Sequence, residues 1–64
     1  MDKENYLIVS PKVLPYVFEG VVLAKELLAS GRAASASAAA KAAGISRSAF
    51  YKYKDFVFKY SAPD

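Results

Sequence analysis

The stretch that decides the fold is residues 39–53, AAKAAGISRSAFYKY. Its alanines are small enough for close helix packing, and Gly44 can adopt the positive φ that ends a helix in a tight turn. Ile45 supplies an apolar side chain to that turn, and Ser46 is a good N-cap for a second helix. Apolar residues then return with helical spacing. We therefore expect a helix-turn-helix, whose second helix projects steeply enough to enter the major groove of DNA.

The composition excludes several classes of function. The 64 residues suffice for one small domain, and they include no cysteine and no histidine. Disulfides and the common zinc sites are therefore excluded, and so are the usual catalytic base and nucleophile. The acidic residues are scattered, and the sequence has no glycine-rich phosphate loop. We expect no enzyme activity, no metal, no cofactor and no small-molecule ligand in this chain.

Charge is distributed unevenly along the sequence. Residues 1–30 carry three lysines and four acidic residues, a net charge of −1, whereas residues 31–64 carry six basic and two acidic residues, a net charge of +4. The positive half contains the expected helix-turn-helix, which favours a phosphate backbone as partner. The alternative is that these lysines and arginines only solvate exposed helix faces.

The expected fold class is all-α, a small three-helix helix-turn-helix domain with a short extended N-terminal segment. Prolines at positions 11 and 15 predict a single turn at residues 11–14 before the first helix. Gly31 is expected to end the first helix and Ser35 to open the second. One domain over residues 1–64 is expected, with a frayed end at 1–5, an extended segment at 6–9, helices at 15–30, 35–43 and 47–60, and a tail at 61–64.

The first expected helix is apolar around most of its circumference. On a helical wheel Glu19 and Glu26 fall on one narrow stripe with Lys12, and the apolar arc is much wider than the roughly 100° of an ordinary surface helix. We therefore expect a homodimer that forms through this helix and the extended segment. The alternative is that residues 6–9 and the aromatic C-terminal residues cover the helix within one chain.

The sequence favours a cytoplasmic location and no association with membranes. Its N-terminal residues lack the basic and apolar regions of a signal peptide. No apolar run approaches the roughly 18 residues of a membrane span, because Glu19, Lys25 and Glu26 interrupt the longest one.

The candidate DNA-binding residues lie at the start of the last expected helix and one turn further on, the positions from which recognition helices contact DNA. Arg47 can donate two hydrogen bonds to a guanine edge, and the serines can reach phosphates or base edges. Tyr51 and Lys52 are placed for phosphate contacts. The full set is Ser46, Arg47, Ser48, Tyr51 and Lys52.

Four segments of the chain resemble the ACT-domain protein PheB family of Firmicute-type bacteria. They are residues 6–9, 13–15 and 24–28 and, most specifically, 45–55, ISRSAFYKYKD. The resemblance is to the N-terminal region of that family, and it implies an amino-acid-responsive transcriptional regulator whose DNA-facing part is this segment. In the family an ACT domain follows, but none follows within these 64 residues, so the resemblance transfers no ligand-binding residues. Residues 45–53 are also similar to TetR-type repressors, more weakly.

Two functions from different classes remain open at this point. In the first, the chain is the DNA-binding helix-turn-helix module of an amino-acid-responsive transcriptional regulator. In the second, it is a dimerisation or interaction domain of an ACT-domain regulatory protein and binds no DNA. The operator sequence and the effector cannot be inferred from the residues.

Overall fold

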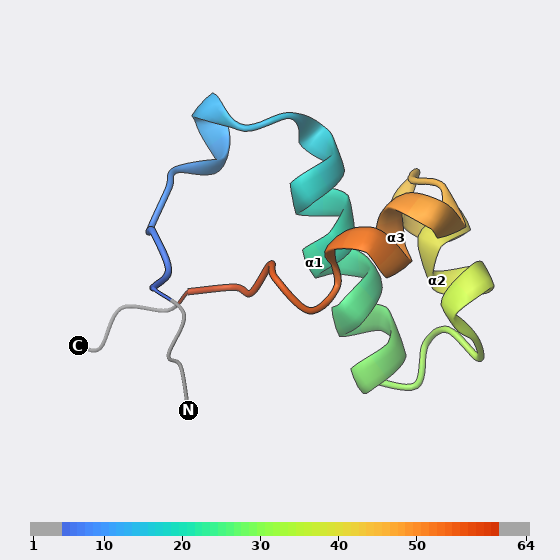
Figure 1. Ribbon diagram of the computed structural model, residues 1–64. Coiled ribbons are helices and arrows are strands. Elements are labelled where there is room, and N and C mark those ends of the chain that lie inside the picture. Colours follow the sequence, from blue (N-terminus) through green and yellow to red (C-terminus); the bar gives the residue numbers. More distant parts are fainter. Residues whose placement is uncertain (1–4, 61–64) are drawn as a thin grey trace.

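Three α-helices and one short 3-10 helix follow one another in the computed structural model, which describes residues 5–60 (Figure 1). They are η1 (Pro11–Val13), α1 (Tyr16–Ala29), α2 (Ala36–Ala43) and α3 (Arg47–Tyr53). No strand occurs within the described residues, which confirms the all-α fold class. Residues 1–4 of the frayed end expected at 1–5 lie outside them, as does the tail expected at 61–64.

The two prolines organise the entry to α1 as the sequence predicts. The Ser10 Oγ accepts a hydrogen bond from the Lys12 amide at 3.2 Å, and Pro11 opens η1. Leu14 is extended, with φ −108° and ψ 151°, as expected for a residue that precedes proline. Pro15 is the N-cap of α1, so the helix begins at Tyr16, one residue later than expected.

Gly44 ends α2 in the left-handed conformation, with φ 79°. Its amide donates to the Lys41 carbonyl at 3.1 Å, and the Ile45 amide donates to the Ala40 carbonyl at 3.0 Å. This pair of bonds is the Schellman motif, which satisfies two carbonyls that a helix end otherwise leaves without partners. The glycine predicted to stop the helix therefore does so.

Serine side chains cap both helices of this pair. The Ser35 Oγ accepts from the Ala38 amide at 3.1 Å, and the Ser46 Oγ accepts from the Ala49 amide at 3.0 Å. Each bond satisfies one amide of a first helical turn, and such a cap typically contributes about 1 kcal/mol. Both serines lie just outside their helices, so α2 begins at Ala36 and α3 at Arg47.

The core is small and is built largely from small side chains. Five residues from all three α-helices form it, and each is no more than 2% exposed: Val21, Ala24, Ala39, Ala40 and Phe50. The alanines let α2 lie close against α1, and Phe50 of α3 fills the space beside them. The single large ring therefore accounts for much of the core volume.

Gly20 permits the closest approach between α1 and the α2–α3 turn. It is buried, and a Cβ atom built on it would overlap with the Cγ2 methyl of Ile45. The same Cβ would lie 3.4 Å from the carbonyl oxygen of Ala43. A side chain at position 20 would therefore push the turn away from α1.

The helix predicted over residues 47–60 is wrong beyond Tyr53. Lys54 is the C-cap of α3, and the Phe56 amide donates to the Tyr53 carbonyl at 2.9 Å in a following turn. Residues 57–60 have no regular secondary structure. The helix stops here because the Lys54 carbonyl bonds to a lysine of α1 instead of to a later amide of its own segment.

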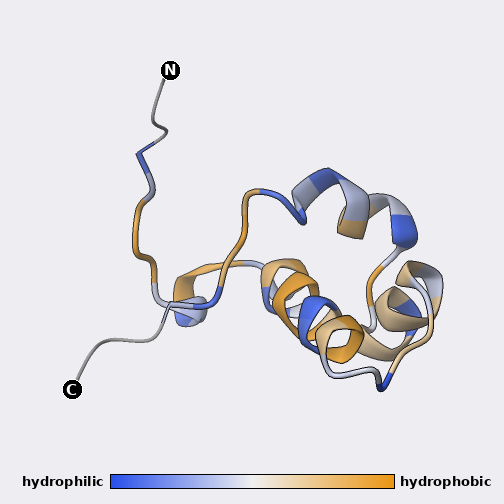
Figure 2. Cartoon of the chain, turned by 90° about the horizontal axis from the view of Figure 1, so that it is seen from below, coloured by the Kyte–Doolittle hydropathy of each residue, from blue (hydrophilic) through white to orange (hydrophobic). Residues whose placement is uncertain are grey.

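Two chain segments extend from the three-helix body on the same side (Figure 1). We call residues 5–10 the N-terminal arm and residues 55–60 the C-terminal arm. The rings of Tyr6 and Phe58 meet edge to face, with centroids 6.0 Å apart. Much of the N-terminal arm and much of α1 consist of hydrophobic residues, coloured orange in Figure 2.

Candidate functional site

The basic region of the molecule is formed by α2, α3 and the turn between them. Residues 35–53 contain three charged side chains, Lys41, Arg47 and Lys52, and all three are basic. They are also exposed, so they contribute a positive potential to the solvent around α3. No acidic residue within this range opposes them.

All five residues predicted to contact DNA are exposed in the structure. Ser46 precedes α3, Arg47 and Ser48 open it, and Tyr51 and Lys52 lie about one turn later. Tyr51 is 53% exposed, although Phe50, its neighbour in sequence, is buried in the core. The burial of Phe50 therefore orients α3 so that these five residues remain accessible.

Two of these side chains already make contacts within the chain. The Arg47 Nη1 donates to the Ser37 Oγ at 3.3 Å, which connects the start of α3 to α2. A guanidinium has five N–H donors, so most of this group stays available to a partner. The Lys52 ammonium lies 5.4 Å from the centroid of the Tyr53 ring.

Ser37 lies in the same basic region, and its contact with Arg47 was not predicted from the sequence. Serine at the second position of an alanine-rich helix has no distinctive signal, and its proximity to Arg47 depends on how α2 and α3 cross. The hydrogen bond restricts the arginine side chain before any partner arrives. Such a restriction lowers the entropy lost on binding.

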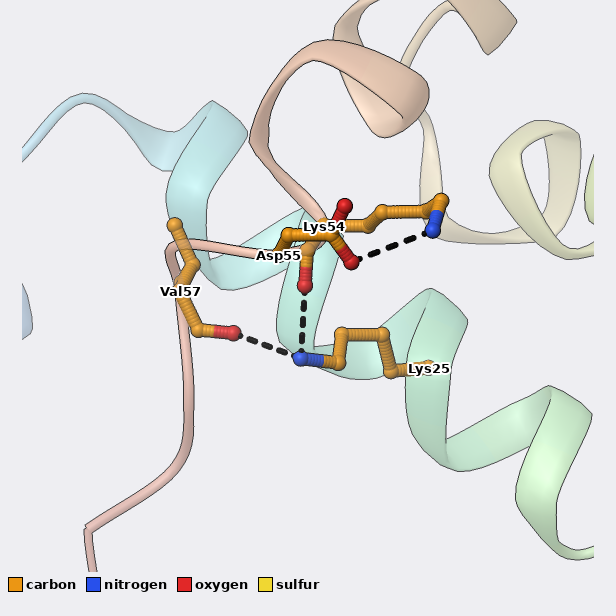
Figure 3. Close-up of polar contacts among 4 residues, drawn as sticks. All are labelled: Lys25, Lys54, Asp55 and Val57. Atoms are coloured by element: carbon orange, nitrogen blue, oxygen red, sulfur yellow. Dashed lines mark hydrogen bonds and ion pairs between the residues drawn. The ribbon is translucent and has the colours of Figure 1, made fainter. Parts of the chain in front are cut away.

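Lys25 is a second residue whose role the sequence did not reveal. Its ammonium donates to the carbonyls of Lys54 and Val57, each at 2.8 Å (Figure 3). The same ammonium lies 3.9 Å from the Phe58 ring centroid. A cation here neutralises the carbonyl end of α3 and fixes the start of the C-terminal arm. On the helical wheel Lys25 falls beside the apolar face and away from the charged stripe, which is the signal that could have found it.

We expect Lys25→Met to lower the free energy of unfolding by about 1–3 kcal/mol, since two hydrogen bonds from a charged donor are lost. Methionine keeps the length and the helix propensity of lysine. Urea denaturation followed by circular dichroism measures the change. Lys41→Met is the matched control, because Lys41 is exposed on α2, and its removal should change stability by less than about 0.5 kcal/mol. Equal losses in the two variants would contradict the anchoring role of Lys25.

Two other kinds of feature, a metal site and a membrane-spanning helix, do not occur in the part of the chain that the structure covers. Within residues 5–60 no three acidic side chains gather in a way that could hold a metal ion. Among these same residues no helix has both the length and the apolar character needed to cross a membrane.

Comparisons with known proteins identify relatives but no solved structure. No family model matches the chain, and no solved structure matches it. A UPF0735 ACT domain-containing protein of Clostridium novyi (strain NT) is 59% identical over 58 residues, which is 91% of this chain and 39% of that protein. Proteins of the same description from Clostridium botulinum (strain Eklund 17B / Type B) and Clostridium perfringens (strain ATCC 13124) are 49% and 51% identical, over 92% and 89% of this chain and 41% and 39% of theirs.

These relatives support the ACT-domain part of the resemblance drawn from the sequence. The chain spans about 40% of the length of the curated relatives that it matches. The descriptions of these proteins name an ACT domain and mention neither a helix-turn-helix nor a TetR-type repressor. Over the residues it spans, the chain is therefore similar to UPF0735 ACT domain-containing proteins.

Proposed function

We propose that the chain is the DNA-binding helix-turn-helix module of an ACT-domain regulatory protein, with α3 as its recognition helix. The observation that carries this proposal is the purely basic character of residues 35–53 together with the exposure of the outer face of α3. A phosphate backbone is the partner that such a surface attracts. The proposed role is transcriptional regulation in amino-acid metabolism, and it includes no catalytic step.

The proposed contacts follow from the donors that each side chain presents. Arg47 is proposed to contact base edges in the major groove, since its remaining N–H groups can form the paired hydrogen bonds that guanine accepts. Phosphate contacts are proposed for the hydroxyls of Ser46 and Ser48 and for the side chains of Tyr51 and Lys52. The Ser46 oxygen caps α3, but its hydroxyl hydrogen remains free to donate.

The expected result in a fluorescence-anisotropy titration is weak binding to random duplex DNA that falls steeply with salt. If two or three of the basic residues each neutralise a phosphate, the log–log salt slope is about −2 to −3. Arg47→Ala and Lys52→Ala should each weaken binding and should each make the slope less negative by about one.

Lys12→Ala is the matched control for this experiment. It removes the same unit of charge from η1, which lies away from α2 and α3 (Figure 1). Equal losses in Lys12→Ala and Arg47→Ala would show that only net charge matters, and they would contradict a defined interface on α3. Absence of binding at low salt would contradict the proposal as a whole.

The second candidate function is an interaction module of an ACT-domain protein that binds no DNA. It is favoured by the location of exposed apolar residues. Twelve large apolar side chains are exposed in the described part of the chain, and only Tyr51 among them belongs to α2 or α3. A chain that fails the DNA titration but associates through the other eleven would match this second candidate.

A further inference from the structure

An apolar groove lies between α1 and the two arms. Its volume is about 1020 Å³, and Phe18, Val22 and Leu23 of α1 line its floor together with residues of both arms. The charged side chains in its lining are Glu19, Glu26 and Lys59, and the last two pair at 3.5 Å. The groove is therefore apolar with a slight negative charge, which disfavours nucleic acid and anionic lipid as occupants.

The N-terminal arm is apolar on both of its sides. Tyr6, Leu7, Ile8 and Val9 are consecutive, and successive side chains of an extended segment point in opposite directions. All four residues line the groove, yet Leu7 remains 88% exposed and Ile8 72% exposed. Extended segments that are apolar on both sides are typically covered on both sides. Within residues 5–60 no backbone hydrogen bond joins Leu7, Ile8 or Val9 to another residue, so this edge can accept a partner.

The exposed area is large enough for a stable interface. Nine of the eleven exposed apolar residues outside α3 line the groove, four of them are aromatic, and an aromatic side chain buries roughly 150–250 Å². From their exposed fractions the face offers on the order of 1,000 Å² of apolar surface, beyond the roughly 300–600 Å² of the largest patch on a typical monomer. A standard interface needs about 800 Å² from each partner.

We propose that this face is the interface between two copies of the chain, related by a two-fold axis, with the N-terminal arm of each copy covering the groove of the other. A two-fold contact requires one surface that is complementary to itself. This face meets that condition because a projecting apolar arm and an apolar groove lie side by side on it. The inference deepens the second candidate function and does not rest on DNA binding, because no residue of α3 lines the groove.

Sedimentation equilibrium of the whole 64-residue chain tests this inference without DNA. The expected result is a monomer–dimer equilibrium with a dissociation constant on the order of micromolar. Leu7→Glu should raise that constant at least about tenfold, since it places a carboxylate in an apolar interface. Leu7 is so exposed in a single copy that its replacement should leave the helical circular dichroism unchanged.

Tyr51→Glu is the matched control, since it places the same carboxylate on an exposed aromatic position of α3. It should leave the dimer constant unchanged. A chain that is monomeric at millimolar concentration overturns the inference, and so does a dimer that Leu7→Glu and Tyr51→Glu weaken equally. A monomeric chain that binds the separately produced remaining part of the Clostridium novyi relative also overturns it and assigns the groove to that part.

Discussion

Replacing Phe50 with alanine is expected to leave a large fraction of the chain unfolded at room temperature. The ring is 2% exposed and is the one large aromatic side chain among the five buried apolar residues. Truncation of a buried phenylalanine typically costs about 3–5 kcal/mol. At about 0.05–0.15 kcal/mol per residue, a domain of this length has a total stability of only about 3–10 kcal/mol. The loss is therefore comparable to the whole free energy of unfolding.

Urea denaturation followed by far-ultraviolet circular dichroism measures this loss. Tyr51→Ala is the matched control, because it truncates an aromatic side chain at the next position of the same helix, where 53% of the residue is exposed. Its cost should be about 1 kcal/mol. Similar costs for the two variants would show that Phe50 does not occupy the centre of the core.

The second large effect is expected from Gly20→Ala, which should destabilise the chain by about 1–3 kcal/mol. In an isolated helix the same change would stabilise by about 1 kcal/mol, because alanine has the higher helix propensity. Here the new methyl group would overlap with the Cγ2 of Ile45. That methyl is attached to the first side-chain carbon, so it cannot swing away as the end of a long side chain could.

A double-mutant cycle separates these opposing effects. Ile45→Ala removes the overlapping methyl, and the Cβ that remains would lie 3.7 Å from the new one, an ordinary van der Waals contact. In the Ile45→Ala background, Gly20→Ala should therefore be neutral or stabilising, as thermal unfolding can show. If Gly20→Ala destabilises equally in both backgrounds, its effect does not arise from contact with the turn.

The local signals in the sequence were sufficient for the helix boundaries near the turn. Ser35, Gly44 and Ser46 act through their own backbone or through an amide three residues away, so their effect does not depend on the rest of the fold. Pro11 and Pro15 are informative for the same reason. These are the positions where a residue type restricts φ or offers a hydrogen bond that few others can.

The end of α3 could not be predicted in this way. No glycine or proline occurs between Tyr53 and Tyr60, and the apolar spacing at Phe56 and Val57 fits a longer helix. The helix ends because Lys25, far away in sequence, bonds to the carbonyls of Lys54 and Val57. A contact across 29 residues depends on the crossing of α1 and α3, which no local pattern contains.

The exposure of the candidate DNA-binding residues could be predicted from the sequence, but their contacts with other helices could not. The helical period places Phe50 inward and Tyr51 outward, and the structure shows the same difference in exposure. The hydrogen bond between Arg47 and Ser37, and the contact between Gly20 and Ile45, both depend on distances between helices. Such distances follow from the packing of alanines in the core, and sequence periodicity does not specify them.

The open apolar face also determines how stability responds to temperature. Unfolding raises the heat capacity mainly because apolar groups enter water, by about 12–15 cal/mol/K per residue in typical domains. In a single folded copy much of the N-terminal arm is already in contact with water, since Leu7 and Ile8 are mostly exposed. The heat-capacity increment of that copy is correspondingly smaller. Its free energy of unfolding therefore follows a broad curve and changes little over a wide range of temperature.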